Sequence, residues 1–286
     1  MSMATTMLDG RDDEFRLCET IARQHYENFS VLSAFVPGSL RPHLSAIYAF
    51  CRGVDDLGDE LAGDRRRALT KWRNQLDRTF AGSPEHPVFR ALGVTIERFS
   101  LPYEEFDKLI RANEMDQEAR RYETFADTLN YCVYSANPVG RLVLGLFGCA
   151  DPKRLALSDA ICTGLQLANF LQDLPTDLAR GRSYWPEEDY RQFDLSSDEL
   201  AKKGGDAHQI QSWTRFEAER TLQYFRQGRP LEHAVPWRLG RQLALYRLGG
   251  EAVVEAILLQ GANPWNGRPT VSHWRKLQLM VQVLTA

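Results

Sequence analysis

The chain has 286 residues, of which 43% are hydrophobic and 26% are charged, and its formal net charge at pH 7 is −3. This slight negative charge argues against a polybasic surface for nucleic acid or anionic lipid. Five cysteines are scattered through apolar helical stretches. Their odd number and spacing favour reduced thiols over disulfides or a zinc site.

No apolar run approaches the roughly 20 residues that a membrane-spanning helix needs. The first ten residues also lack an apolar core of signal-peptide length. We therefore expect a cytoplasmic protein without a transmembrane segment. Peripheral contact with the inner face of the membrane stays open.

Apolar residues recur with helical spacing almost throughout the chain, and no alternating stretch predicts a strand. Proline- and glycine-containing breaks separate the segments, and residues 181–206 are the least helical. We predict one all-α domain over 1–286, with about 1–11 as a flexible tail. The predicted helices cover about 12–28, 42–61, 64–81, 86–99, 103–116, 124–148, 152–174, 209–227 and 236–260.

The first acidic cluster ends an apolar run at residues 46–54. Asp55 and Asp59 lie four residues apart, so they share one face of the predicted helix. A solvated helix face is the alternative, but it does not explain the apolar run. Like charges at this spacing destabilise a helix unless something neutralises them. A divalent cation would do so.

A stripe along the same helix links this cluster to other polar groups. Tyr48, Arg52, Asp55 and Asp59 follow one another at spacings of four, three and four residues. Asp56 and Glu60 lie off the stripe, and we expect Asp56 to reach a metal ion through water.

The second acidic cluster repeats the spacing of four with Asn169, Asp173 and Asp177. Acids at a helix C-terminus oppose the helix dipole, so this placement also needs a compensating cation. The alternative is a helix end that carries acids without a function. Pro175 should kink or end the helix nearby, which makes Asp177 the weakest predicted ligand of the three.

Arginines follow the second cluster. Arg180 and Arg182 would lie on the next turn or loop, where a guanidinium could receive phosphate oxygens. For Arg180, a surface arginine without a function is an equally good interpretation. For Arg182, that interpretation is weaker than phosphate binding.

A third group of residues surrounds Pro138. This proline interrupts a helical run and predicts a kink, and Gly140 would permit close approach of a neighbouring backbone. Helix packing explains part of the pattern. The functional interpretation is a bent helix that makes room for an isoprenoid chain, with Tyr134 and Asn137 beside it.

Three sequence blocks together resemble the squalene/phytoene synthase family. They are Tyr-Ala-Phe-Cys-Arg before the first aspartates, Asn-Pro-Val-Gly-Arg-Leu, and Asn-Phe-Leu-Gln-Asp through Arg-Gly-Arg-Ser-Tyr-Trp-Pro. The resemblance covers about residues 16–275. It implies an isoprenoid synthase helical bundle with a central cavity, prenyl diphosphate substrates, and Mg²⁺ between the two aspartate motifs.

This resemblance and the motifs together give the expected site residues. The expected catalytic residues are Asp55, Asp59, Asp173, Tyr134 and Asn137. The expected substrate-binding residues are His25, Asn28, Phe29, Tyr48, Arg52, Gln166, Asn169, Arg182 and Tyr184. The expected metal ligands are Asp55, Asp56, Asp59, Asn169, Asp173 and Asp177.

Departures from the family pattern point to one branch of it. Glu27 and Asn28 stand where relatives carry basic and hydroxyl groups, Gln172 where they often carry arginine, and Thr176 where they often carry an acid. The segment His-Tyr-Glu-Asn-Phe and the block around Pro138 resemble bacterial hydroxysqualene synthases of hopanoid pathways. That resemblance implies Mg²⁺-dependent conversion of presqualene diphosphate and water to hydroxysqualene and diphosphate, without a nicotinamide. Handover to other squalene-pathway enzymes is open.

Other functions stay open at this point. One is head-to-head condensation of two prenyl diphosphates, as in presqualene diphosphate, phytoene or NADPH-dependent squalene synthases. No glycine-rich dinucleotide loop is visible, which is weak evidence against NADPH. The alternative of another class is a non-catalytic helical scaffold, against which the presence of both acidic motifs argues.

Overall fold

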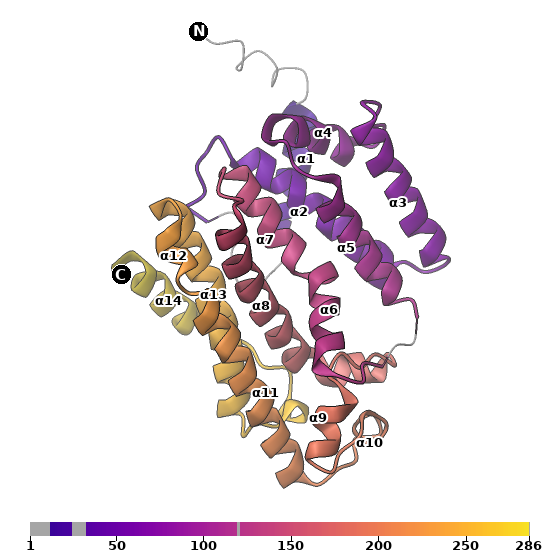
Figure 1. The fold of residues 1–286 in the computed structure, drawn as a ribbon, viewed down its shortest axis with the longest axis vertical. Coiled ribbons are helices and arrows are strands. Elements are labelled where there is room, and N and C mark those ends of the chain that lie inside the picture. The colour runs from indigo at the N-terminus through magenta and orange to yellow at the C-terminus, as the bar shows by residue number, and fades with distance from the viewer. Residues whose placement is uncertain (1–11, 25–32, 119–120, 286) are drawn as a thin grey trace. The chain divides into compact units, whose positions relative to one another are not determined.

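The structure, a computed structural model, describes residues 12–24, 33–118 and 121–285. Within these residues the chain is helical and has no strand; one isolated bridge joins Arg121 to Ser183 (Figure 1). The all-α prediction is confirmed. None of the described helices combines the length and the apolarity that crossing a bilayer requires.

The chain divides into two compact units. Unit 1 comprises Met1–Gln117 and Arg141–Asp151, and unit 2 comprises Glu118–Gly140 and Pro152–Ala286. The expectation of a single domain over 1–286 stays a prediction. The first acidic motif belongs to unit 1 and the second to unit 2.

Unit 1 is built around helix α2, which contacts α1, α4 and α5. Helix starts follow the local sequence: Asp64 accepts a hydrogen bond from the backbone N–H of Arg67, and prolines occupy the first turns of α2 and α4. The unit also holds the second part of α7 (Asn137–Leu146). Its other elements are α1 (Asp12–Gln24), α2 (Arg41–Asp55), η1 (Asp56–Glu60), α3 (Arg65–Phe80), α4 (Pro87–Phe99) and α5 (Tyr103–Met115).

Aromatic rings fill the core of unit 1. Phe50 contacts Phe89 and Phe106 edge to face, with ring centroids 5.8 and 5.2 Å apart. His43 is buried, and its Nδ1 lies 2.9 Å from the Thr95 hydroxyl. Burial, together with the charge of Arg98, lowers the pKa of His43 to about 4. His43 is therefore a neutral core histidine.

Unit 2 is built around α8, which contacts α6, α11 and α13. Four of its helices were not predicted, namely α9, α10, α12 and α14. The first three are one or two turns long. Helix α10 begins at the side-chain cap Ser196, whereas Pro186 and Pro230 precede α9 and α12 without a side-chain cap. The elements are α6 (Phe125–Ser135), α7 (Asn137–Leu146), α8 (Pro152–Ala179), α9 (Glu187–Gln192), α10 (Ser197–Ala201), α11 (Ala207–Gly228), α12 (Leu231–Ala234), α13 (Trp237–Leu259), η2 (Pro264–Asn266) and α14 (His273–Thr285).

The predicted bend at Pro138 is confirmed. Helix α6 ends before Ala136, which leaves helical geometry at φ −121° and ψ −49°, and α7 begins one residue later. Pro138 then lies in the first turn of α7, where its missing N–H costs nothing. A Cβ on Gly140 would come within 2.4 Å of the Ser158 hydroxyl oxygen and 2.6 Å of the Cys162 sulfur. Only glycine allows α7 to start this close to α8.

The predicted helix end near Pro175 is wrong. Helix α8 passes through Pro175 and continues to Ala179. Proline removes one backbone donor, but the remaining hydrogen bonds of a 28-residue helix hold it together. Leu174 and Leu178 are buried on either side of the proline and keep this turn packed against the unit.

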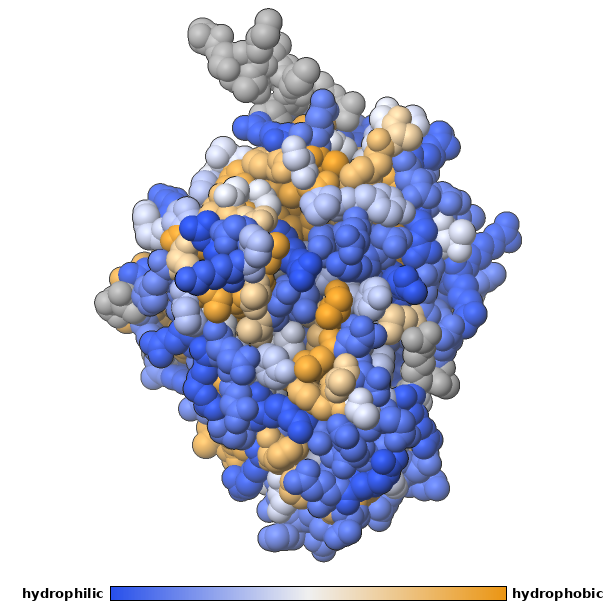
Figure 2. Space-filling view, viewed as in Figure 1, coloured by the Kyte–Doolittle hydropathy of each residue, from blue (hydrophilic) through white to orange (hydrophobic). Residues whose placement is uncertain are grey.

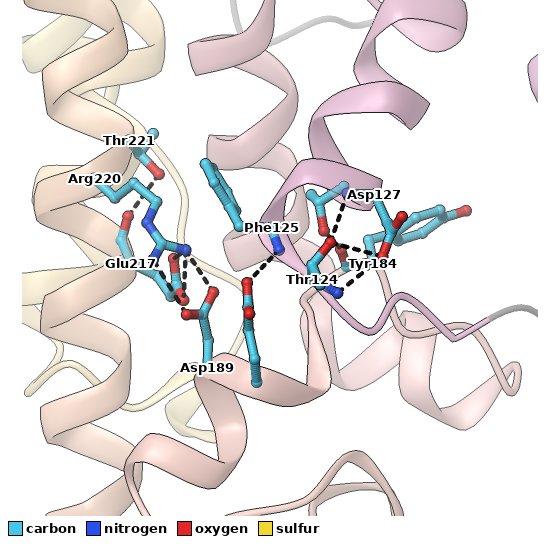
Figure 3. A network of polar contacts seen from close by, with 10 residues as sticks. Thr124, Phe125, Asp127, Tyr184, Asp189, Glu217, Arg220 and Thr221 are labelled. Carbon is cyan, nitrogen blue, oxygen red and sulfur yellow. Dashed lines mark hydrogen bonds and ion pairs between the residues drawn. The ribbon is translucent and has the colours of Figure 1, made fainter.

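A buried charged cluster links α9 and α11 in unit 2 (Figure 3). The Arg220 guanidinium binds both Asp189 and Glu217, and it lies between the rings of Phe125 and Phe216, 4.0 and 4.5 Å from their centroids. Glu217 is fully buried. Burial raises the pKa of its carboxyl well above the ordinary value; Arg220 opposes this shift and Asp189 adds to it.

This cluster predicts a pH dependence of stability. A carboxyl whose pKa is higher in the folded than in the unfolded chain stabilises the fold at low pH, and that contribution is lost as pH rises above its unfolded pKa of about 4.3. Glu217→Gln cannot lose a proton. Its free energy of unfolding should therefore rise relative to the native chain with increasing pH, by up to about 1.4 kcal/mol per pH unit.

Urea denaturation between pH 4.5 and 8 measures this difference. The control is Glu219→Gln on the same helix, because Glu219 is exposed and pairs with exposed Arg226. Its stability should follow that of the native chain. Parallel curves for the native chain and Glu217→Gln would contradict the assignment.

Candidate active site

The first acidic motif sits where α2 changes into the π-helical turn η1. Arg52 pairs with Asp56 and donates to the Glu60 carboxylate at 2.6 Å. The predicted stripe grouped Arg52 with Asp55 and Asp59, and that grouping stays a prediction. Arg52 also binds Asp56 and Glu60, which the sequence analysis placed off the stripe.

Arg52 keeps its charge in this setting. Burial alone would lower the pKa of its guanidinium, but the hydrogen bonds and charges of Asp56, Asp55 and Glu60 outweigh burial and raise it. Tyr48 is half-buried on α2, one turn before Arg52. The motif therefore combines three aspartates with a fixed cation inside unit 1.

Helix α5 supports this motif through residues that the sequence analysis missed. Asn113 donates to the Asp55 carboxylate at 3.3 Å, and Gln117 donates to the backbone carbonyl of Gly58 at 3.1 Å. Asn113 lies in the last turn of α5, and Gln117 follows four residues later, just after the helix ends at Met115. The spacing of these two residues is visible in the sequence, but no local pattern indicates that they contact the segment around Asp55.

Glycine lets the motif approach its neighbours. A Cβ on Gly58 would lie 2.1 Å from the Asn113 side-chain oxygen, and a Cβ on Gly53 would lie 2.4 Å from the Trp72 ring. Neither distance is possible for a real side chain without displacement. Asp59, which follows Gly58, is half-buried, and its backbone carbonyl accepts from Arg65 at 3.0 Å. The backbone of the motif is thus fixed on two sides.

The second motif lies on α8 in unit 2. Because the helix continues through Pro175, Asn169, Asp173 and Asp177 keep a spacing of four residues on one side of it. Asn169 is exposed, while Asp173 and Asp177 are half-buried. Gln166 is half-buried on the same helix, one turn before Asn169. Asp177 therefore lies on the same side of the helix as Asn169 and Asp173. The expected helix end at Pro175, which made Asp177 the weakest predicted ligand, is absent from α8.

Arg268 binds the central carboxylate of this motif, and the sequence analysis missed it. Its Nε and Nη2 donate to the two oxygens of Asp173 at 2.7 and 3.2 Å. This hydrogen bond raises the pKa of Arg268. Nearby, buried Gln172 donates to the backbone carbonyl of Pro269 at 2.6 Å and so holds the loop that carries Arg268.

This geometry changes the charge balance inferred from the sequence. Gln172 stands where the resemblance implies an arginine, so the sequence alone indicates one cation fewer beside the second motif. In the structure Gln172 fastens the loop, and Arg268 supplies a cation to the next residue along α8. The second motif is therefore less negative than the sequence indicated.

The residues near the bend have structural partners. Asn137 is buried at the start of α7, and its side-chain oxygen accepts from the Thr163 hydroxyl on α8 at 3.2 Å. Tyr134 is half-buried on α6, one turn before the break. Asn137 thus ties α7 to α8, and any role in catalysis stays a prediction.

Tyr184 and Arg182 follow α8. Tyr184 is buried and stacks on Phe170, with ring centroids 4.4 Å apart and planes within 6°. The half-buried Arg182 donates its backbone N–H to the carbonyl of Asp177 at 2.9 Å. The chain after α8 therefore turns back on the motif. His25, Asn28 and Phe29 lie outside the described residues.

The donor set of the two motifs fits a hard cation, since carboxylate and amide oxygens are the ligands that Mg²⁺ prefers. Across residues 12–24, 33–118 and 121–285, no three histidine, cysteine, aspartate or glutamate side chains gather closely enough to hold a metal ion. Arginines meet the acids instead, at Asp56 and Asp173. These carboxylates would exchange a guanidinium for the ion.

Comparison with known proteins decides the family. The profile of squalene/phytoene synthases matches residues 22–275. The chain belongs to this family. It is an enzyme of prenyl diphosphate chemistry, and the expectation drawn from the three sequence blocks is confirmed.

Several relatives span nearly the whole chain. The crystal structure of squalene synthase HpnC from Alicyclobacillus acidocaldarius shares 52% identity, with a TM-score of 0.83 over 88% of this chain and 95% of that one. A dehydrosqualene synthase in complex with a ligand has the same fold, with a TM-score of 0.88, 24% identity, and coverage of 97% and 98%. The 15-cis-phytoene synthase of Synechococcus elongatus is 30% identical, over 96% of this chain and 94% of that protein.

The close approach at Gly58 predicts a selective loss of stability. Gly58→Ala would press a methyl group into Asn113, and overpacking of this kind costs about 1–3 kcal/mol. The matched control is Gly38→Ala, because a Cβ at Gly38 meets nothing within 4 Å. Chemical denaturation of both variants measures the difference. Equal stabilities would show that the packing of η1 against α5 is not tight.

Proposed function

We propose that this enzyme converts presqualene diphosphate and water into hydroxysqualene and diphosphate. The observation that carries the proposal is the 52% identity with squalene synthase HpnC, compared with 30% for a phytoene synthase. This difference favours a farnesyl-derived substrate over a geranylgeranyl-derived one. The water-capture step rests on the resemblance of residues 25–29 and of the block around Pro138 to hydroxysqualene synthases.

Both acidic motifs would serve the diphosphate. Asp55, Asp59, Asn169, Asp173 and Asp177 would hold Mg²⁺, with Asp56 contributing through water. Bound Mg²⁺ would neutralise the leaving diphosphate and so promote ionisation of the C–O bond. This assignment rests on family membership and on the oxygen donors of each motif.

Two arginines would prepare the motifs for an anionic substrate. Arg52 and Arg268 each bind motif carboxylates through charge-assisted hydrogen bonds. A diphosphate carries more negative charge than a carboxylate, and a planar guanidinium group can bind either anion. We therefore assign to Arg52 and Arg268 the role of binding phosphate oxygens once their carboxylates take the metal ion. Arg268 adds a substrate-binding residue to the predicted set.

The remaining predicted residues would act on the hydrocarbon part. Phe29, Tyr48 and Tyr134 offer aromatic faces, which stabilise positive charge through their quadrupoles. An apolar surrounding would keep bulk water away from the carbocation until one water molecule captures it. Tyr134 and Asn137 are the candidates for positioning that water. Asn137 would do so with the orientation that Thr163 imposes on its amide.

A second candidate function is head-to-head condensation of two prenyl diphosphates. The 30% identity with 15-cis-phytoene synthase over 96% of this chain favours it. The two functions differ in their substrates. Condensation consumes farnesyl or geranylgeranyl diphosphate alone, whereas the proposed reaction starts from presqualene diphosphate.

Isotope labelling tests the proposed reaction directly. With presqualene diphosphate, Mg²⁺ and ¹⁸O-labelled water, the product should be hydroxysqualene that carries the label, because solvent is the sole oxygen source in cation capture. NADPH should neither accelerate the reaction nor divert it to squalene. Squalene formed only with NADPH would identify a full squalene synthase. Turnover of farnesyl or geranylgeranyl diphosphate alone would identify the condensing enzyme.

Substitution of single carboxylates tests the site. Asp55→Asn, Asp59→Asn, Asp173→Asn and Asp177→Asn should each lower turnover by about two orders of magnitude or more, since a metal contact in the transition state contributes several kcal/mol. Asp194→Asn is the control, because Asp194 is exposed and its φ of 54° suits asparagine. Steady-state kinetics, with circular dichroism to verify folding, measures the effect. Full activity of Asp55→Asn and Asp173→Asn would refute the assignment.

A further inference from the structure

Helix α14 carries an unusual concentration of exposed apolar side chains. It packs on α13, and its residues Leu279 and Val283 are buried, at 5% and 1% exposure. Within the part of the chain that the structure describes, ten large apolar side chains are exposed, and five of them lie on this one helix. They are Trp274, Leu277, Met280, Val281 and Leu284, with exposures of 48–78%.

These side chains form a stripe. Trp274, Leu277, Val281 and Leu284 follow one another at spacings of three, four and three residues, which places them on one side of the helix. The helix has no acidic residue and carries Arg275 and Lys276 in its first turn; Arg275 pairs with Glu255 of α13. Figure 1 shows α14 beside α12 and α13 at the margin of unit 2. Figure 2, in the same view, shows apolar and hydrophilic side chains mixed over the face that is seen.

Cationic side chains lie next to the C-terminal end of this helix. A pocket formed by α12, α13 and α14 is lined by Arg229, Trp237, Arg241 and Gln282, and also by Glu232, which pairs with Arg247. Trp237 is 65% exposed, and the Arg238 guanidinium lies 5.3 Å from its ring centroid. Among the described residues, no carboxylate pairs with Arg229, Arg238 or Arg241. The end of the apolar stripe thus carries uncompensated positive charge.

We propose that α14, with the start of α13, docks on an anionic lipid bilayer. An apolar stripe flanked by tryptophans and basic residues is the pattern of a helix that lies in the membrane interface. Trp237 and Trp274 would sit at the headgroup level, and Leu277, Val281 and Leu284 would enter the acyl boundary. Arg229 and Arg241 would bind lipid phosphates, each contributing electrostatic attraction within a Debye length of the surface.

Charge favours a bilayer over a second copy of the chain as the occupant. A two-fold contact through this face would bring two sets of unpaired arginines together, and the pocket carboxylate Glu232 is already paired with Arg247. An anionic membrane supplies the missing negative charge. The net charge of −3 argued against anionic lipid, but it is a sum over the chain and does not report the local charge at this face.

Vesicle flotation with the full chain tests the proposal. The native chain should float with vesicles of phosphatidylcholine and phosphatidylglycerol, and about tenfold less with phosphatidylcholine alone or in 0.5 M salt. Leu277→Gln/Leu284→Gln should reduce binding to the anionic vesicles about tenfold or more. Arg229→Gln/Arg241→Gln should remove most of the preference for phosphatidylglycerol. No substrate is needed, so the outcome is independent of which reaction the enzyme catalyses.

Matched controls come from other exposed sites. Leu17→Gln and Arg215→Gln should bind as the native chain does, since Leu17 lies on α1 and Arg215 on α11. Trp274→Ala, at the most exposed position of the stripe, repeats the test if the double leucine variant does not fold. Failure of the native chain to float, or equal binding by the α14 variants, would overturn the proposal. The proposal would also be overturned if light scattering showed a dimer that the Leu277→Gln/Leu284→Gln substitutions dissociate and that vesicles leave intact.

Discussion

Neutralisation of acidic side chains by arginine is the interaction on which both motifs depend. Carboxylates four residues apart on a helix repel each other, and an apolar surrounding makes unpaired charge costly. Arg52 meets this constraint in unit 1 and Arg268 meets it in unit 2. Under the proposed function, these carboxylates would exchange arginine for a metal ion. The freed guanidinium groups would then bind phosphate.

Rigid helices fix the positions of these carboxylates. Close contact at Gly58 and hydrogen bonds from Asn113 and Gln117 hold the first motif on α2 and η1. The second motif lies on the unbroken α8, to which Gln172 fastens the loop of Arg268. Preorganisation of this kind matters for ionisation of a diphosphate, since donors already in place need no reorganisation as charge develops.

The proposed membrane contact of α14 fits the chemistry of the proposed substrate and product. Prenyl diphosphates combine a long hydrocarbon chain with an anionic head, and the proposed product loses the anionic head. Such a product partitions into a bilayer, so an enzyme held at the membrane surface shortens its path. The apolar stripe and the unpaired arginines would provide this attachment without any membrane-crossing helix.

The sequence by itself determined the all-α class, the positions of both acidic motifs and the break before Pro138. These features depend on helical periodicity and proline chemistry, which act over a few residues. Tertiary structure decided what each motif residue contacts: Asn113 reaches Asp55 across 58 positions, and Arg268 reaches Asp173 across 95. It also kept α8 helical through Pro175, because buried leucines on both sides outweigh one lost hydrogen bond. Local patterns carry no information about such distant partners, since these depend on which helix faces the packed core brings together.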